Sequence, residues 1–342
     1  MTLDIDFVRS HFPGFASPDL NELAFFESAA GSLPCSFVLD RLERFYRERK
    51  VQPGEAYQPS AIGQDEMDEA RMRLAALMGV APDEVSFGPS TTQNTFVLAN
   101  AFRQWMEPGD AIIVTDQDHE ANSGAWRRLE EEGIEIREWR IDPQTGHLDI
   151  EDLEPLLPGA RLLAFPHCSN VIGEINDVSA IAEAAHSEGV AVCVDGVSYA
   201  PHGLPNVGAM GADIYLFSTY KTYGPHQGIM VIRSELGEAL PNQAHYFNGG
   251  ALYKRFNPAG ADHAQVAACA GIADYIDALA AYLGRADATP VERGKIVHDA
   301  MRAREIQLTQ PLLEYLRTKN AIRLLGPDKA ERRAPTIALY SD

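Results

Sequence analysis

Polar side chains that can do chemistry follow five apolar runs of the sequence. They are Ser90-Thr91-Thr92, Asp118-His119, Ser169-Asn170, Asp195 and the segment from Ser218 to Pro225. Hydroxyls and backbone N–H groups at a helix start hold a phosphate, an imidazole stacks on an aromatic ring, and an amide bonds a ring hydroxyl. A carboxylate keeps a pyridine nitrogen protonated, and a lysine forms an imine with an aldehyde. A pyridoxal phosphate site is the one chemistry that uses every member of this set.

Each of these residues also has an ordinary structural interpretation. Ser90 before a helix is typical of an N-cap, and His119 in a loop is typical of a surface histidine. Asp195 before Gly196 is typical of a turn, and Lys221 is typical of a lysine exposed to solvent. The order and spacing of the whole set therefore carry the prediction. Lys221 must be partly neutral to attack an aldehyde, which requires desolvation or a neighbouring cation.

The elements that must position these residues alternate along the chain. We predict strands over Val85–Phe87, Ala111–Thr115, Ile134–Trp139, Arg161–Pro166, Ala191–Val194, Ile214–Phe217 and Ile229–Ile232. Helical runs between them include Gln93–Trp105, Ala121–Glu132 and Val178–Glu188. Several strands are apolar without alternation, as strands covered on both faces are. The pattern predicts a mostly parallel sheet with helices on both faces, whose ligands collect at the carboxyl ends of the strands.

The last part of the chain departs from this alternation. Only about a dozen residues join the last two predicted strands of the sheet, which is short for a crossover helix, so we expect one of them to run antiparallel. After Gly250 the pattern predicts helices over Ala261–Gly284 and Pro290–Thr318, then a strand over Thr336–Tyr340. We therefore expect a small second domain whose sheet is only beginning where the sequence stops.

Composition limits the classes of partner. The 342 residues include 49 acidic and 29 basic side chains, a net charge of −20 that repels nucleic acid and anionic membrane surfaces. Four cysteines without disulfide or zinc-site spacing suit a reducing compartment. The start of the chain lacks the pattern of a signal peptide, and aspartates interrupt the apolar Ala261–Gly284 run, which indicates a soluble helix. We expect a cytoplasmic protein without a metal site.

From about Leu23 to its end, the sequence resembles the class V aminotransferases of fold type I, and among them the cysteine desulfurase and selenocysteine lyase-like branch. The resemblance lies in Phe25–Ala30, Phe87–Asn94, Asp118–Asn122, Ser169–Gly173, Val194–Gly196 with Pro201-His202, and Ser218–Pro225. Each motif is weak alone. Their common order and spacing make the resemblance specific.

The resemblance implies an α/β fold of the pyridoxal phosphate-dependent transferase fold type I. Residues 15–255 would form a large domain around a seven-stranded sheet, and residues 1–14 with 256–342 a small, apparently incomplete α/β domain. It implies catalytic roles for Lys221, His119 and Asp195. The cofactor-binding set is Ser90, Thr91, Thr92, His119, Asn170, Asp195, Ser198, Ser218, Tyr220 and Lys221. A homodimer with its active site at the interface is implied as well.

The sequence departs from the desulfurase pattern in three parts of the chain. Tyr220 stands where a histidine usually contacts the phosphate, and Ser198 stands where a longer glutamine is usual. The segment 256–260 lacks the threonine that reaches the phosphate of the neighbouring subunit. The persulfide-forming cysteine and the carboxylate-binding arginine of desulfurases lie beyond Asp342, so the chain is either truncated or works without them. Cys168, at a strand end near Asn170, is the alternative sulfur acceptor.

The resemblance and the residues together lead to three hypotheses. The first is a pyridoxal phosphate enzyme acting on an amino acid through Lys221, with desulfurase-like or C–S lyase chemistry on cysteine or a derivative. The second is an aminotransferase or an amino-acid epimerase of the same class. The third is a binding protein that keeps the fold without turnover. A nicotinamide-binding protein is excluded, because no Gly-x-Gly-x-x-Gly follows the first strand.

Overall fold

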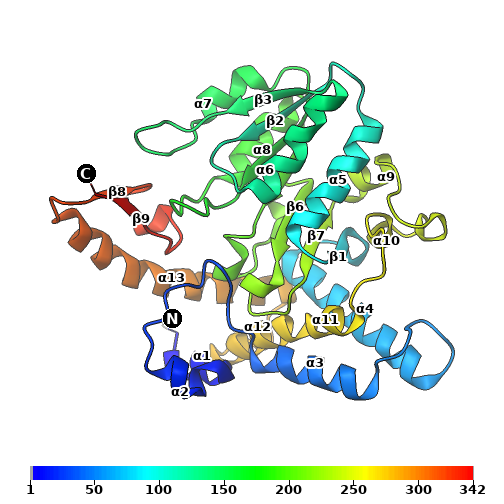
Figure 1. The fold of residues 1–342 in the computed structure, drawn as a ribbon. Helices are drawn as coiled ribbons and strands as arrows, with labels where there is room; N and C mark the ends of the chain where they lie inside the picture. Colours follow the sequence, from blue (N-terminus) through cyan, green and yellow to red (C-terminus); the bar gives the residue numbers. More distant parts are fainter. Residues whose placement is uncertain (1–2, 342) are drawn as a thin grey trace.

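A seven-stranded sheet runs through the centre of the molecule in the computed structural model, which describes residues 3–341 (Figure 1). Its strands are β1 (Val85–Gly88), β2 (Ala111–Thr115), β3 (Glu135–Trp139), β4 (Ala160–Pro166), β5 (Ala191–Asp195), β6 (Ile214–Ser218) and β7 (Gly228–Ile232). Their order across the sheet is β1-β7-β6-β5-β4-β2-β3. All seven predicted strands are confirmed, with ends that differ by at most one residue.

One strand of the sheet runs against the others. β7 lies between β1 and β6 and pairs antiparallel with both, with Ile214 opposite Ile232 and Val85 opposite Val231. The connection from β6 to β7 holds only a 3-10 turn over Thr219–Lys221, which is too short for a crossover helix. The predicted antiparallel strand is therefore confirmed. As a result, the first residue of β7 lies beside the last residue of β6, with Gly228 opposite Ser218.

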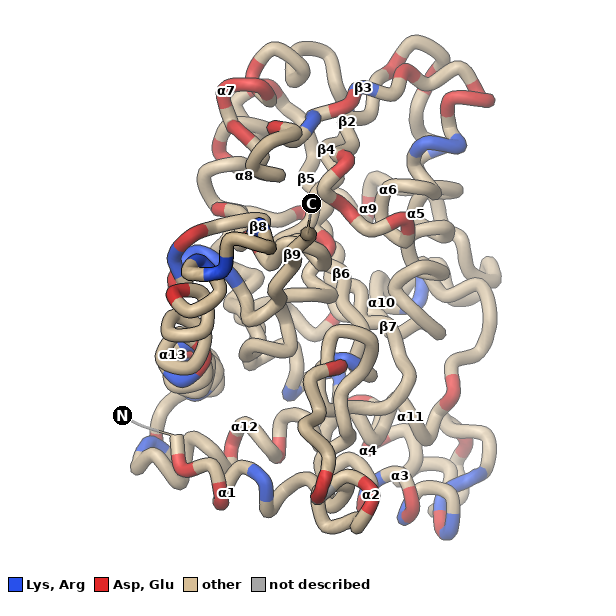
Figure 2. The backbone as a smooth tube through the Cα atoms, turned by 60° about the vertical axis from the view of Figure 1, so that its left-hand side comes forward, with Lys and Arg blue, Asp and Glu red and all other residues tan. Residues whose placement is uncertain are grey.

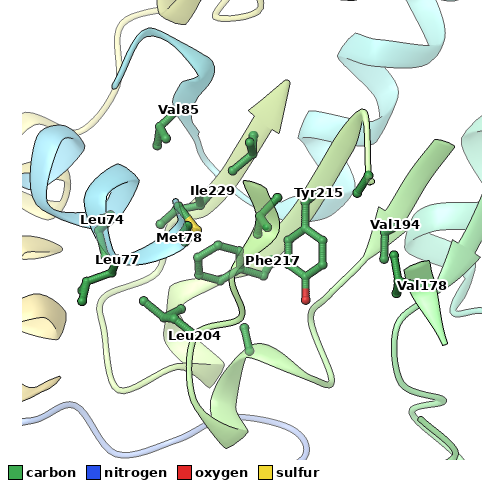
Figure 3. Close-up of a cluster of buried hydrophobic side chains, with 14 of the residues drawn as sticks. Leu74, Leu77, Met78, Val85, Val178, Val194, Leu204, Tyr215, Phe217 and Ile229 are labelled. Atoms are coloured by element: carbon green, nitrogen blue, oxygen red, sulfur yellow. The ribbon is translucent and has the colours of Figure 1, made fainter. Parts of the chain in front are cut away.

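Helices cover both faces of the sheet. α5 (Thr91–Trp105) and α6 (Glu120–Arg127) lie on one face, and α4 (Gln58–Met78) and α8 (Val178–Ser187) lie on the other. β4 shows the division, because Leu162 and Ala164 belong to one apolar cluster while Leu163 and Phe165 belong to the other. Figure 3 shows part of the α4 side, where Met78 lies near Phe217 and Ile229. Burial on both faces explains the lack of alternation in these strands.

A layer of helices lies beside α4, at the bottom of Figure 1. It contains α3 (Ser36–Glu48), α11 (His263–Ala268), α12 (Ala270–Tyr282) and α13 (Pro290–Arg317). The single helix predicted over 261–284 is wrong in one respect, because α11 and α12 are separate. At Cys269 the backbone N–H approaches the carbonyls of both Gln265 and Val266, and the thiol donates to the Gln265 carbonyl at 3.2 Å. The bond to Val266 spans three residues instead of four and departs from the regular helical pattern at this residue.

The stretch His263–Tyr282 has the length and apolarity of a membrane-crossing helix, and 72% of its most apolar window is buried inside the molecule. A core helix has the same properties, so this stretch is weak support for a membrane span.

The remaining elements are short. They are α1 (Ile5–Ser10), α2 (Pro18–Asn21), α7 (Ile150–Leu153), α9 (Ser234–Ala239), α10 (Leu252–Arg255), β8 (Arg323–Leu325) and β9 (Ala338–Tyr340). β9 pairs antiparallel with β8 and is the predicted C-terminal strand, two residues shorter. The helix predicted over 121–132 ends as a 3-10 turn from Arg128. The division into domains stays a prediction, and its outermost residues, 1–2 and 342, lie outside the described residues.

Charged residues are spread over the elements of the periphery (Figure 2). Acidic segments occur at both ends of the view, for example at α7 and α3, and basic segments lie between them, several of them near α13 and β8. A stripe of basic residues is the footprint of nucleic-acid binding proteins. Along residues 3–341 the view shows no such stripe.

Candidate active site

All ten residues predicted to bind the cofactor line one cavity at the carboxyl ends of the strands. The cavity has a volume of about 330 Å³ and is lined by Ser90, Thr91, Thr92, His119, Asn170, Asp195, Ser198, Ser218, Tyr220 and Lys221. Asp118, Ala121, Pro166, Cys168, Val197 and His226 complete the lining. The volume lies within the range of small-molecule sites. The fold therefore gathers residues from five strand ends that are up to 131 positions apart in the chain.

The start of α5 forms a polar end of the cavity. Ser90 is the N-cap, and its hydroxyl accepts from the N–H of Gln93 at 3.2 Å. The hydroxyls of Thr91 and Ser218 are joined by a hydrogen bond of 2.8 Å. The first N–H groups of a helix have no acceptor inside the helix, and the helix dipole favours an anion beside them. This end of the cavity can hold a phosphate.

Gly228 brings the start of β7 against this helix start. A Cβ placed on Gly228 would lie 2.4 Å from the carbonyl carbon of Ser90 and 2.7 Å from the backbone nitrogen of Thr91. Real Cβ atoms essentially never approach so closely, so the position requires glycine. The strand that follows the lysine loop and the helix start that follows β1 are thus in direct backbone contact.

His119 is the N-cap of α6. Its Nδ1 accepts from the N–H of Ala121 at 3.0 Å, which places the proton of the neutral ring on Nε2. The preceding residue, Asp118, accepts from the N–H of His119 at 2.8 Å and from the amide of Asn122 at 2.5 Å. These bonds fix the imidazole at the wall of the cavity, where a flat ring can lie against it.

Two carboxyl groups share the deep part of the cavity. Burial raises the pKa of Asp195. The N–H of Val197, which donates to this carboxyl at 2.7 Å, and the neighbouring side chains of His119 and Lys221 act in the opposite direction. Burial, and then repulsion from Asp195, raise the pKa of Asp118 well above its usual value. Within the described residues neither carboxyl forms an ion pair. A cation between them, such as a protonated ring nitrogen, would favour their ionised forms.

Lys221 follows β6 in a tight turn. Burial lowers the pKa of its amine, and the charge of Asp195 raises it again to a smaller extent. The turn is held by the N–H of Thr219, which donates to the carbonyl of Gln227 at 2.8 Å, and Tyr223 adopts a left-handed backbone with φ 61°. A desolvated amine on a rigid turn matches the requirement for a partly neutral lysine.

The loop that carries Asn170 is held by the C-terminal segment. Gly173 has φ 72°, and its carbonyl accepts from the N–H of Ala334 at 2.8 Å. Buried Arg333 donates to the carbonyl of Ile172 at 2.9 Å and to three carbonyls of its own segment. A segment far along the chain thereby holds Asn170 beside the cavity.

A larger cavity adjoins the first on the side of Lys221. It has a volume of about 740 Å³ and shares His119, Asn170, Val197, Ser198 and Lys221 with the first. Its other walls are mainly apolar and include Phe12, Phe15, Phe25, Leu33 and Pro201. Because the two cavities meet at Lys221, a substrate can approach the amine from this side.

Two polar residues of the lining had no predicted role. Asp118 was named with His119 at the end of a strand but was not assigned to the site. His226 follows Gly224-Pro225, where the family resemblance gave no role. Its ring stacks on Tyr220 with centroids 4.7 Å apart.

The four cysteines are buried free thiols. Burial raises the pKa of Cys35 to about 11 and those of Cys168 and Cys269 to about 12, and it raises the pKa of Cys193 well above its usual value. A sulfur acceptor needs an accessible thiolate. Cys168 lines the cavity, but its thiol donates to the carbonyl of Gly173 at 3.4 Å and is 2% exposed. None of the four has the environment of a persulfide-forming cysteine.

Comparison with known proteins gives a consistent set of relatives. The family model described as aminotransferase class-V matches residues 24–341. An aminotransferase-like protein of Gibberella zeae is 33% identical over 98% of this chain and 82% of its own. A cysteine desulfurase of Serratia proteamaculans is 35% identical over 70% of this chain. That match spans 61% of the desulfurase, so less than two thirds of its length is represented.

Solved structures show the same fold. A cysteine desulfurase of Thermococcus onnurineus superposes with a TM-score of 0.79 and 22% identity, over 98% of this chain and 82% of that one. A cysteine desulfurase of Escherichia coli superposes with a TM-score of 0.77 and 23% identity, over 96% and 82%. At these identities the likeness concerns the fold, which confirms the predicted fold class.

Proposed function

The chain belongs to the class V aminotransferase family of pyridoxal phosphate-dependent enzymes, and from this premise we propose that it acts on an amino acid through Lys221. The proposed reaction is C–S bond cleavage in cysteine or a cysteine derivative. The observation that carries the proposal is the single cavity that joins Lys221, Asp195, His119 and the start of α5.

The residues present fit pyridoxal phosphate. The hydroxyls and N–H groups at the start of α5 suit its phosphate. The carboxyls of Asp195 and Asp118, which form no ion pair among the described residues, suit a protonated ring nitrogen. When bound, pyridoxal phosphate supplies an electron sink that stabilises negative charge on the α-carbon of an amino acid. Lys221 would hold its aldehyde, and Asn170 would bond its ring hydroxyl.

The side chains then have separate tasks. Lys221 takes the proton from the substrate α-carbon on Nζ, since burial makes this amine more readily neutral than an ordinary lysine. Asp195 would hold the proton at the ring nitrogen. His119, fixed by Ala121, would bound the ring face, and Ser198 lies where the two cavities meet.

The buried cysteines bear on the fate of the sulfur. Because burial raises the pKa of all four thiols, we propose that no cysteine among the described residues takes up the sulfur. Cleavage of cysteine at its Cβ–S bond then releases hydrogen sulfide, and addition of water to the remaining fragment gives pyruvate and ammonia. With a cysteine derivative, the corresponding thiol leaves.

Transamination is the second candidate. It is favoured by the aminotransferase-like protein of Gibberella zeae, which matches 98% of this chain. Epimerisation uses the same α-proton transfer at Lys221. A binding protein without turnover is less well supported, because such a protein needs no desolvated lysine beside a buried carboxylate.

We also propose a homodimer in the cytoplasm. A cavity of about 800 Å³ lies beside the site and is lined by Phe87, Phe96 and Phe256. Phe96 in its wall is 42% exposed. A second copy of the chain would cover this ring. Four free thiols support a reducing compartment.

The test begins with absorbance spectra of the purified protein incubated with pyridoxal phosphate, before and after borohydride. We expect a visible band that borohydride abolishes, with the pyridoxyl group found on the peptide containing Lys221. Lys221→Ala should lack both, whereas Lys295→Ala, at a side chain 71% exposed, should keep them. A colourless wild-type protein would favour the binding-protein hypothesis.

Substrate assays then separate the reactions. Sulfide and pyruvate from cysteine support C–S cleavage, a keto acid formed with an amino acceptor supports transamination, and loss of optical activity alone supports epimerisation. Formation of a persulfide on any cysteine of the chain would contradict the proposal for the sulfur.

A further inference from the structure

We propose that His226 is a phosphate-binding residue whose imidazole is held in place by the ring of Tyr220. The inference rests on the proposed function, because the phosphate is that of the proposed cofactor. The family resemblance gives no role to His226.

The two rings form a parallel stack at the wall of the cavity. Their centroids are 4.7 Å apart and their planes are within 4° of parallel. Both side chains line the cavity that Ser90, Thr91 and Thr92 also line. The stack therefore belongs to the cavity that contains the start of α5.

The loop between β6 and β7 sets this arrangement. The N–H of Thr219 donates to the carbonyl of Gln227 at 2.8 Å, which closes the loop next to both rings. Gly228 then passes directly against the backbone of Ser90 and Thr91. His226 is thereby kept within two residues of the contact between β7 and the helix start.

A hydrogen bond orients the imidazole. Nδ1 of His226 lies 3.2 Å from the carbonyl oxygen of Pro89, which can only accept, so Nδ1 carries a proton. Nε2 is the ring nitrogen left for a ligand. When it is protonated, it donates a charge-assisted bond to an anion, which is stronger than a neutral one.

The charges around the cavity favour this assignment. Among the described residues that line it, the basic side chains are Lys221, His119 and His226. Lys221 is assigned to the cofactor aldehyde, and Nδ1 of His119 is bonded to the N–H of Ala121. His226 is the remaining basic group for the negative charge of a phosphate. The imidazole of His226 thus takes the place of the histidine that the desulfurase pattern has at position 220, where this chain has tyrosine.

The experiment compares two cofactor analogues without an aldehyde, pyridoxine phosphate and pyridoxine, which cannot bond covalently to Lys221. Dissociation constants are measured by equilibrium dialysis, and the readout is the preference for the phosphorylated analogue. His226→Ala should reduce this preference about tenfold. His226→Asn retains a donor for the Pro89 carbonyl and should lose the preference equally.

Matched variants separate stacking from other effects. His245 stacks on Phe247 with ring centroids 5.3 Å apart, and neither residue lines the cavity. His245→Ala should therefore leave the preference unchanged. Tyr220→Phe keeps the stacked ring, so a change of preference in this variant measures the phenol hydroxyl and not the stack. Tyr220→Leu removes the stack and should reduce the preference about threefold.

The outcomes distinguish this inference from the proposed function. An unchanged preference in His226→Ala, or a wild-type protein that binds both analogues equally, overturns the assignment of His226. If pyridoxal phosphate is nevertheless fixed on Lys221, the proposed function stands. If the preference falls as expected while pyridoxal phosphate never attaches to Lys221, the phosphate site is supported and the proposed function is overturned.

Discussion

The hydroxyl of Ser32 accepts a hydrogen bond from the backbone N–H of Tyr223 at 2.9 Å, and it donates one to the carbonyl of Tyr220 at 3.2 Å. These two residues flank the lysine turn, although Ser32 lies near the other end of the chain. The N–H of Ser32 also donates to the Tyr220 carbonyl, at 2.9 Å. The N-terminal segment therefore closes around the backbone that carries Lys221.

Ser32→Ala should loosen this turn. We expect a loss of about 1 kcal/mol in the free energy of unfolding, since one side chain satisfies two backbone groups. A smaller fraction of the protein should carry a borohydride-fixed pyridoxyl group at Lys221. Ser187→Ala, which removes a comparable hydroxyl-to-carbonyl bond of 2.7 Å on the surface, should change neither quantity. Equal effects of the two variants would contradict this role of Ser32.

Asp118→Asn should stabilise the cofactor-free protein at neutral pH. The folded-state pKa of Asp118 is raised, so its favourable contribution is present below its unfolded pKa and is lost as the pH rises through the folded value. The variant lacks this loss, and its melting temperature should exceed that of the wild type by about 2–4 °C at pH 7, as roughly 1 kcal/mol gives in a large domain.

The difference should close as the pH falls toward the unfolded pKa of an aspartate. Thermal unfolding between pH 4 and pH 8 measures it. Asp116→Asn, at an exposed carboxylate whose Oδ1 accepts from the N–H of Ile141, is the control and should show no such gain. A variant less stable than the wild type at every pH would refute the sign of the effect.

Cys168→Ala should retain cysteine cleavage. The thiol is buried, and burial raises its pKa to about 12, so little thiolate exists near neutral pH. We expect sulfide release within about twofold of the wild-type rate, measured with the protein loaded with pyridoxal phosphate. Loss of sulfide release with cofactor attachment intact would identify Cys168 as the sulfur acceptor after all.

Arg333→Met should destabilise the protein by about 3 kcal/mol or more, because four backbone carbonyls lose a buried, charged donor. Urea unfolding measures the loss. Hydrogen exchange should quicken at the N–H of Gly173 and its neighbours, which the C-terminal segment covers. Arg332→Met, at the exposed neighbouring arginine, should leave both measurements near wild type.

The alternation of apolar runs was sufficient to predict the sheet, and the strand ends together with the family resemblance gave the ten residues that line the cavity. This succeeded because parallel strands end at one edge, so residues after Gly88, Thr115 and Asp195 meet whatever separates them in the chain. Strands that are buried on both faces are apolar throughout, and the sequence shows this as short uninterrupted apolar runs. The helix through Pro311 was likewise predicted from periodicity and is confirmed.

Other features depend on contacts that no local pattern records. The break at Cys269 arises from competing carbonyls, and the tie between Arg333 and the loop after Cys168 joins segments more than 150 positions apart. The mutual effect of Asp118 and Asp195 likewise requires the distance between two strand ends. The pairing of Tyr220 with His226 depends on the shape of one loop.

The placement of β7 between β1 and β6 has a consequence for synthesis on the ribosome. Among the described residues β1 pairs only with β7, so Val85–Gly88 remains without this partner until residues 228–232 have been translated. At about 5–20 residues per second this interval lasts several seconds or longer. During that time the β1 edge is open to wrong pairing, and the nascent chain has no completed cofactor cavity. A chaperone that binds the nascent chain during this interval would protect β1, which lies at the edge of the sheet in the folded protein.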